Sequence, residues 1–262
     1  NTAVGKNSLT ANTTGGANTA VGQGALDANT TGSNNTAIGK DALTAATTAS
    51  NNVAIGFAAA GALTTGTQNV GIGFQALDAA TTSNSNTAIG YTSMTTMTSG
   101  NQNVAVGSGS LHSSTSATNS VAVGFNALTT NTTGADNIAV GQAALDANTT
   151  GDNNTAVGNA ALSANTTADG NSAFGREALN RNTTGALNTA VGHVALNVNT
   201  TGFENTAVGA GSMDASTTGA YNTAVGSQSM SENTEGVQNA AFGGYALDAN
   251  TTGDFNTAVG MH

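Results

Sequence analysis

The stretch NTAVGQGALDANTTGSN at residues 18–34 decides the fold, because close copies of it fill the whole chain. The glycine that ends its Ala-Val-Gly triplet, Gly22, recurs every 17 residues from Gly5 to Gly260 without an insertion or deletion. We take this glycine as position 0 of each copy, number the other residues relative to it, and call residues at the same position a column. Such a strict short period is typical of a chain that stacks one structural unit on copies of itself.

Positions −3 to −1 of each copy predict a short β-strand. Position −2 is alanine in fifteen of sixteen copies, as in Ala20 and Ala37, and Gly71 is the exception. Position −1 is valine or isoleucine except at Phe174 and Phe242, and position −3 exchanges threonine with valine or isoleucine. Branched residues on one face and alanine on the other suit a strand. Because the connections are too short for crossover helices, we expect an all-β, parallel β-solenoid of about 15 coils with 17 residues per coil.

The second half of each copy fits two local structures. Position +4 is leucine in most copies, as in Leu26 and Leu43, and position +8 is always threonine, as in Thr30 and Thr47. A second short strand between turns fits this pattern, and so does a single helical turn. We expect the valine or isoleucine at −1 and the leucine at +4 to share a thin interior. These large apolar groups are too few to offset the ordering of a whole coil, which favours a trimer or larger assembly.

Three further columns have a structural interpretation. The asparagine at position −4, as in Asn18 and Asn35, can satisfy a turn and form an amide ladder between coils. The threonines at +8 can form a similar hydroxyl ladder. The glycines at position 0, as in Gly22 and Gly39, suit a positive φ or a close contact between coils.

Composition excludes several functional classes. The chain has 262 residues and a formal charge of −10, and its only basic side chains are Lys6, Lys40, Arg176 and Arg181. Without a basic patch we expect no nucleic-acid binding, and no apolar run approaches the length of a membrane span. We interpret residues 1–262 as one β-solenoid domain with no linker, and as a fragment or processed product because the chain starts inside a repeat with asparagine.

No residue pattern indicates an enzyme, a cofactor or a metal site. The histidines His112, His193 and His262 share no column, so they are not expected to converge on a metal or a nucleophile. No copy contains the inserted loops from which solenoid enzymes build clefts. The acids at position +5 are lone carboxylates, which we interpret as solubilising charges because calcium prefers six or more oxygen ligands: Asp27, Asp78, Asp146, Asp214 and Asp248.

Position +1 carries the most distinctive deviation. It reads Phe57, Phe74, Tyr91, Ser108, Phe125 in consecutive copies, and it is mainly polar elsewhere. Three consecutive aromatic residues one coil apart predict a stacked stripe. Such a stripe can bind a host-surface glycan or protein, or it can pack against a neighbouring chain or cover the wall edge.

Two other sequence patterns suggest surface chemistry. Asn-Thr-Thr is formally an acceptor for N-glycans, although turn chemistry explains the same residues: Asn12, Asn29, Asn131, Asn148, Asn165, Asn182, Asn199 and Asn250. A threonine-rich solenoid can also present a regular hydroxyl array to ice. The second threonine that directly follows Thr30, Thr31, is expected to point to the opposite face, which makes ice binding a lesser alternative.

Particular copies resemble known repeats. The units at residues 52–56, NVAIG, and 120–124, SVAVG, resemble the coil motif of YadA-like trimeric autotransporter adhesin heads. The longer unit at residues 154–167 is similar to shaft repeats of tail-fibre proteins. The resemblance implies a left-handed β-roll with three chains around one axis, exposed on a cell or virion surface. The coil here is longer than the adhesin coil, and the extra stretch falls around Leu-x-x-Asn-Thr-Thr.

These observations together predict a non-enzymatic, extracellular structural or adhesive protein. We expect a rigid β-roll shaft or head of a trimeric adhesin or tail fibre. The alternatives are a subunit that polymerises end to end into a surface filament, and an ice-binding β-solenoid.

Overall fold

The computed structural model describes residues 1–261, and they form an all-β, parallel β-solenoid of about 15 coils. No residue in this described range is helical. The coils group into two compact units, Asn1–Thr133 and Gly134–His262, which we call unit 1 and unit 2 and describe separately. The single domain over residues 1–262 stays a prediction.

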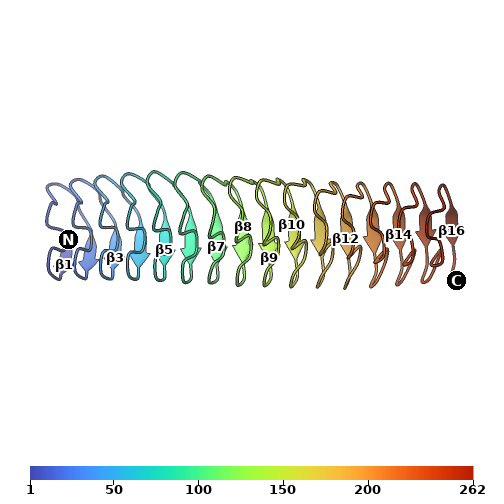
Figure 1. The fold of residues 1–262 in the computed structure, drawn as a ribbon. Coiled ribbons are helices and arrows are strands. Elements are labelled where there is room, and N and C mark those ends of the chain that lie inside the picture. The colour runs from blue at the N-terminus through green and yellow to red at the C-terminus, as the bar shows by residue number, and fades with distance from the viewer. Residues whose placement is uncertain (262) are drawn as a thin grey trace. The chain divides into compact units, whose positions relative to one another are not determined.

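Unit 1 contains eight three-residue strands that pair side by side in chain order (Figure 1). Each pair is parallel, and residues 17 apart are partners, as in Ala20 with Ala37. The strands are β1 (Thr2–Val4), β2 (Thr19–Val21), β3 (Thr36–Ile38), β4 (Val53–Ile55), β5 (Val70–Ile72), β6 (Thr87–Ile89), β7 (Val104–Val106) and β8 (Val121–Val123).

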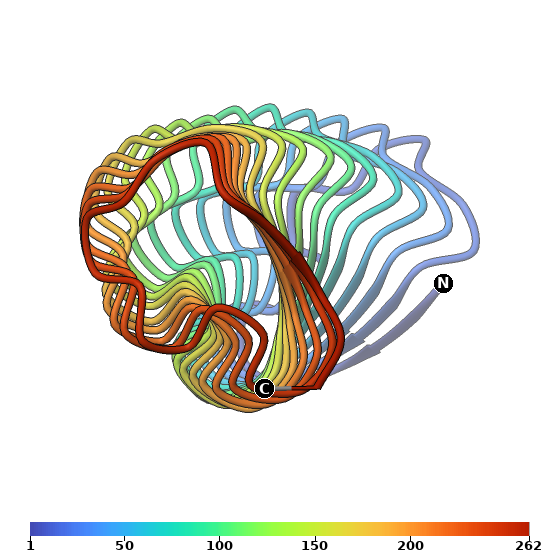
Figure 2. The same cartoon turned by 90° about the vertical axis from the view of Figure 1, so that its right-hand side faces the viewer.

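Unit 2 repeats this arrangement with the same register, as in Ala190 with Ala207. Seen from one end, the coils within each unit lie over one another (Figure 2). The strands are β9 (Ile138–Val140), β10 (Thr155–Val157), β11 (Ser172–Phe174), β12 (Thr189–Val191), β13 (Thr206–Val208), β14 (Thr223–Val225), β15 (Ala240–Phe242) and β16 (Thr257–Val259).

The strands turn alanine inward and their branched residues outward. Ala20 and Ala37 are fully buried, whereas Val21 and Ile38 are 36% and 39% exposed. The prediction that valine or isoleucine at position −1 lines the interior was therefore wrong. In a strand of three residues the middle side chain points to one side and its two neighbours point to the other. Here the middle position is the alanine, and its small side chain lets the two walls of the coil approach closely.

The second wall is neither a strand nor a helical turn, so both expected local structures were wrong. It is a run of turns in which positions +2 and +4 have positive φ, as in Asp41 (59°) and Leu43 (50°). Because φ changes sign at Leu43, both Leu43 and its neighbour Ala42 point inward and are fully buried. Backbone hydrogen bonds still join the coils, for example from the Leu26 N–H to the Ala42 carbonyl at 3.1 Å. This wall is thus hydrogen-bonded to its neighbours without regular β geometry.

Asparagines at position −4 form a buried ladder between coils. The backbone N–H and the side-chain amide of Asn35 both donate to Oδ1 of Asn18, at 2.9 and 3.2 Å. The same amide also donates to the Ala49 carbonyl at 2.8 Å. Each asparagine therefore satisfies a buried turn and links its coil to the next, which offsets the cost of burying its polar atoms.

A second asparagine ladder at position +7 is interrupted. Asn29 donates to Oδ1 of Asn12 at 2.8 Å, and Asn199 donates to Oδ1 of Asn182 at 2.7 Å. The next residues in this column are Ala46, which has no polar side chain, and Ser216, whose shorter side chain makes no bond to Asn199. Oδ1 of Asn29 and Oδ1 of Asn199 are consequently buried without a partner in the described chain, and so is Oγ of Ser216.

Restoring the ladder in unit 2 is expected to stabilise the protein. The variant Ser216→Asn supplies an amide that can donate to Asn199 and an oxygen that can accept from Asn233, so the free energy of unfolding should rise by about 1 kcal/mol. Denaturant unfolding measures the change. Ser227→Asn, which adds the same group outside the ladder, serves as the control. Equal effects of the two substitutions would contradict the ladder interpretation.

The glycine at position 0 allows adjacent coils to approach closely. These glycines have φ between +132° and +143° from Gly5 to Gly260. At Gly192 an added Cβ would lie 2.6 Å from the carbonyl oxygen of Gly209 in the next coil. Both the backbone conformation and the contact therefore exclude a side chain at this position.

We expect Gly192→Ala to destabilise unit 2 by about 3 kcal/mol, because it adds both φ strain and a backbone clash. Thermal unfolding followed by circular dichroism measures this loss. Gly244→Ala is the matched control, since the nearest atom to an added Cβ there is 3.7 Å away. If both variants melt at the same temperature, the close approach at Gly192 does not limit stability.

Candidate functional surface

The most extensive surface feature is the outer face, which we define as the side chains at positions −3 and −1 of the strands. In unit 1 it includes Ile89 and Val104, and in unit 2 it includes Ile138 and Val140; all four are exposed. Sequence reasoning missed this face because it placed position −1 in the interior. The free exchange of threonine with valine at position −3 was the available signal, since a solvated side chain tolerates that exchange.

The predicted aromatic stripe lies on unit 1. The rings of Phe57 and Phe74 stack with centroids 5.2 Å apart and planes inclined by 12°. Phe74 and Tyr91 stack at 5.3 Å and 14°. Both faces of the Phe74 ring are therefore covered, and only the ring edges face the solvent. Phe125 lies two coils beyond Tyr91 in the same column, and no described aromatic ring pairs with it.

A cation closes one end of this stripe. The ammonium group of Lys40, in the preceding coil, lies 5.2 Å from the centroid of Phe57. Lys40 also forms an ion pair with Asp41. Because Phe57 is covered by Phe74 on one side and by Lys40 on the other, its ring faces are not available to a ligand.

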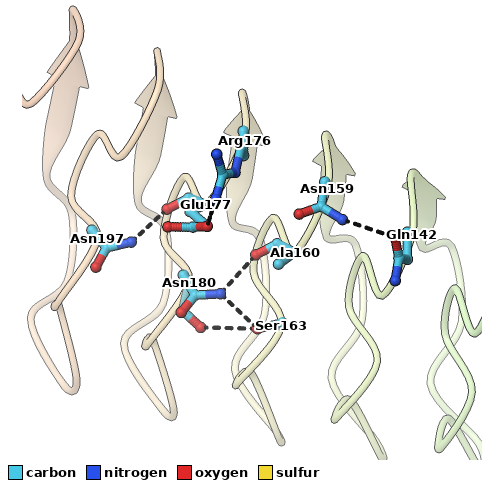
Figure 3. Close-up of polar contacts among 8 residues, drawn as sticks. All are labelled: Gln142, Asn159, Ala160, Ser163, Arg176, Glu177, Asn180 and Asn197. Carbon is cyan, nitrogen blue, oxygen red and sulfur yellow. Dashed lines mark hydrogen bonds and ion pairs between the residues drawn. The ribbon is translucent and has the colours of Figure 1, made fainter.

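In the first three coils of unit 2 the same column is polar, with Gln142, Asn159 and Arg176 (Figure 3). The amide of Asn159 donates to Oε1 of Gln142 at 3.4 Å, and Arg176 pairs with Glu177 at 2.7 Å. Asn180 donates to the Ala160 carbonyl at 2.9 Å and to Oγ of Ser163 at 2.8 Å.

Asn197 repeats this pattern by donating to the Glu177 carbonyl at 2.9 Å (Figure 3). Polar side chains in this part of unit 2 therefore bond within and between coils, and the aromatic stripe distinguishes unit 1 from this arrangement.

The five acids at position +5 lie in separate coils. Within residues 1–261 no three histidine or acidic side chains lie close enough together to hold a metal ion. Asp27 accepts a hydrogen bond from the hydroxyl of Thr10. Burial raises the pKa of Asp78, Asp146 and Asp214 above the ordinary value, and the negative charge of Glu232 raises the pKa of Asp214 further.

The remaining candidate residues are dispersed or structurally engaged. Nδ1 of His112 lies 3.0 Å from the Thr92 carbonyl, His193 belongs to unit 2, and His262 lies outside the described residues. The asparagines of the Asn-Thr-Thr sequences point inward. Six of them are fully buried in the folded chain and are not exposed glycan acceptors: Asn29, Asn131, Asn148, Asn165, Asn182 and Asn199.

The threonines at position +8 direct their hydroxyl groups along the stack. Oγ1 of Thr30 donates to the carbonyl of Thr47 at 3.0 Å, and Oγ1 of Thr47 donates to the carbonyl of Thr64 at 3.2 Å. The ladder therefore joins hydroxyl to carbonyl rather than hydroxyl to hydroxyl. Because these hydroxyl protons are donated to carbonyl groups of the protein, this column does not support the ice-binding alternative. Ice binding stays a prediction.

No protein-family model and no curated protein matches the chain. The described residues also contain no helix with the length and apolar character that crossing a membrane requires. The geometry of the surface is therefore the main evidence about function.

The raised pKa of Asp146 makes the stability of the folded chain depend on pH. Because the folded state holds this proton more tightly than the unfolded state, ionisation of Asp146 opposes folding. This destabilisation is absent below the ordinary pKa of aspartate. It grows as the pH rises above that value and is complete once the pH exceeds the raised pKa of Asp146 in the folded state. We expect Asp146→Asn to raise the melting temperature at pH 7 and to have little effect at about pH 3.

Glu235→Gln is the control for Asp146→Asn, because it removes the same charge from an exposed position of unit 2. It should change stability little at either pH. A pH-independent effect of Asp146→Asn would show that burial of the carboxylate is not the cause.

Proposed function

We propose that the chain is a structural protein: a rigid, left-handed β-roll shaft or head that associates as a homotrimer through its outer face. Its place is extracellular, on a cell surface or virion, and it acts without catalysis or cofactors. Its task is to project or connect a recognition element.

The exposed apolar outer face is the observation that carries this proposal. Every strand from β2 to β15 has valine, isoleucine or phenylalanine at position −1, on the solvent side. Strands of three residues are about 10 Å long and lie about 4.8 Å apart, so the eight strands of each unit offer an outer face of about 400 Å². An apolar face of this extent favours burial against another chain.

The regular stacking supports a shaft rather than a binding domain with one deep site. Coils are joined by backbone bonds on both walls and by the asparagine ladder at position −4. No copy contains an insertion that could form a cleft. Bending the stack would require many of these hydrogen bonds to distort together. This resistance to bending suits a rigid spacer.

The resemblance of residues 52–56 and 120–124 to adhesin-head coils supports the same proposal. Valine and isoleucine dominate the outer face in these coils, with Val53, Ile55, Val121 and Val123. The left-handed coil, the trimer and the extracellular location follow from the resemblance and are part of the proposal.

Charge reversal on the outer face tests association. Val140, Phe174 and Val191 are exposed at position −1 of unit 2, in β9, β11 and β12. We expect the parent protein to sediment with three times the chain mass of 25.2 kDa. The triple variant V140K/F174K/V191K should sediment as a monomer, because buried unpaired ammonium groups oppose association. Analytical ultracentrifugation gives both masses.

The matched control for association is T150K/T184K/T201K, which adds the same charge at exposed positions away from the outer face. It should leave the trimer intact. A parent protein that is monomeric at all concentrations overturns the proposed trimer. Long polymers that survive V140K/F174K/V191K would instead support the end-to-end filament.

A further inference from the structure

The aromatic column of unit 1 has one missing ring. Position +1 carries rings at Phe57, Phe74 and Tyr91, a serine at Ser108, and a ring again at Phe125. Phe57 and Phe74 are each 42% exposed, whereas Tyr91 and Phe125 are 60% and 55% exposed. Phe57 and Phe74 are covered on both faces, Tyr91 is covered by Phe74 on one face, and no ring covers Phe125.

The gap at Ser108 has the dimensions of one ring. Tyr91 and Phe125 are separated by two coil spacings, which is about 10 Å. Phe74 occupies the equivalent place between Phe57 and Tyr91, with centroid distances of 5.2 and 5.3 Å. A ring inserted above Ser108 can therefore stack on Tyr91 and on Phe125 at ordinary contact distances.

Polar groups border the gap. Ser108 carries a hydroxyl group at the position of the missing ring, and the flanking Tyr91 carries a phenolic hydroxyl group. The side-chain oxygen of Asn126 lies over Gly109, the residue after Ser108. Neither the Ser108 hydroxyl nor the Asn126 amide has a side-chain hydrogen bond within the described chain, so both can bond to a ligand. Two ring faces with hydroxyl and amide groups at the edge suit a sugar, whose ring has apolar C–H faces and polar edges.

Charge and area narrow the choice of ligand. The chain has a formal charge of −10, which disfavours phosphorylated or acidic ligands. The gap itself, about 10 Å between the two flanking residues, offers far less area than a second copy of the chain requires. We propose that the gap between Tyr91 and Phe125 is a binding site for one neutral pyranose ring of a glycan.

This site is independent of the proposed trimer. Its residues belong to position +1 of unit 1, beyond the glycine that ends each strand, whereas the association test alters position −1 of unit 2. The stacked ring faces of Phe57 and Phe74 are not part of it. We therefore assign ligand binding to Tyr91 and Phe125 and not to the whole aromatic stripe.

The test is to fill the gap from within the chain. Ser108→Phe places a ring between Tyr91 and Phe125, as Phe74 lies between Phe57 and Tyr91. The variant should therefore fold and remain as stable as the parent protein. Ligand-observed NMR with methyl β-glucopyranoside, methyl β-galactopyranoside and methyl α-mannopyranoside measures binding. We expect the parent protein to bind at least one pyranoside and Ser108→Phe to bind none.

Two further substitutions assign the contacts. Tyr91→Ala and Phe125→Ala should each weaken binding about tenfold, because each removes one stacking face. Phe57→Ala should leave binding unchanged, since that ring lies outside the gap. Ser227→Phe, at the same position of unit 2, should also leave binding unchanged and controls for the added ring.

Three outcomes overturn the proposal. One is the absence of pyranoside binding by the parent protein, and another is binding that survives Ser108→Phe. In the third outcome the parent protein binds N-acetylphenylalaninamide but no pyranoside, and Ser108→Phe abolishes this binding. That result would assign the gap to an aromatic side chain of a protein partner. None of these outcomes depends on whether the chain sediments as a trimer, so failure of the two proposals can be distinguished.

Discussion

Close contact between successive coils through the backbone is the constraint on which the rest of the structure depends. At position 0 the chain passes so near the next coil that a Cβ at Gly192 would meet the carbonyl of Gly209 at 2.6 Å. This contact requires glycine, and it holds every coil at the same register. Equal register then places equivalent positions above one another, which allows the asparagine and threonine ladders to form. An insertion in one coil would break these ladders on both sides.

The same close packing determines which side chains face the solvent. A thin coil has room for alanine at position −2, as at Ala20 and Ala37, but not for a column of isoleucines. The large side chain of the interior comes instead from the second wall, where Leu26 is fully buried with a φ of 51°. A leucine in the left-handed region is strained, and its burial offsets that strain. The branched residues are left outside, and they create the apolar face proposed to hold the assembly together.

Regular stacking also explains how one substitution can create a site. In a uniform column each ring covers the next, so a run of aromatic residues such as Phe57, Phe74 and Tyr91 offers mainly edges to a ligand. Replacing one ring by the small Ser108 opens two ring faces at a fixed separation. The coil spacing sets that separation, so the scaffold itself would define the size of the ligand. A repeat protein can in this way gain recognition without a loop or a pocket.

The sequence by itself determined the period, the solenoid, the strand at positions −3 to −1 and the columns of asparagine, threonine and glycine, because a strict repeat fixes register before any contact is known. It did not determine which side of the strand faces inward. Alternation over three residues allows either choice, and only the closeness of the two walls selects alanine for the interior. Nor could it give the turns of the second wall, because positive φ at Leu43 goes against the local preference of leucine and is imposed by packing. The stripe at Phe57, Phe74 and Tyr91 was visible as a pattern, but only the tertiary structure shows that these rings stack on one another and that Tyr91 and Phe125 are more exposed than Phe57 and Phe74.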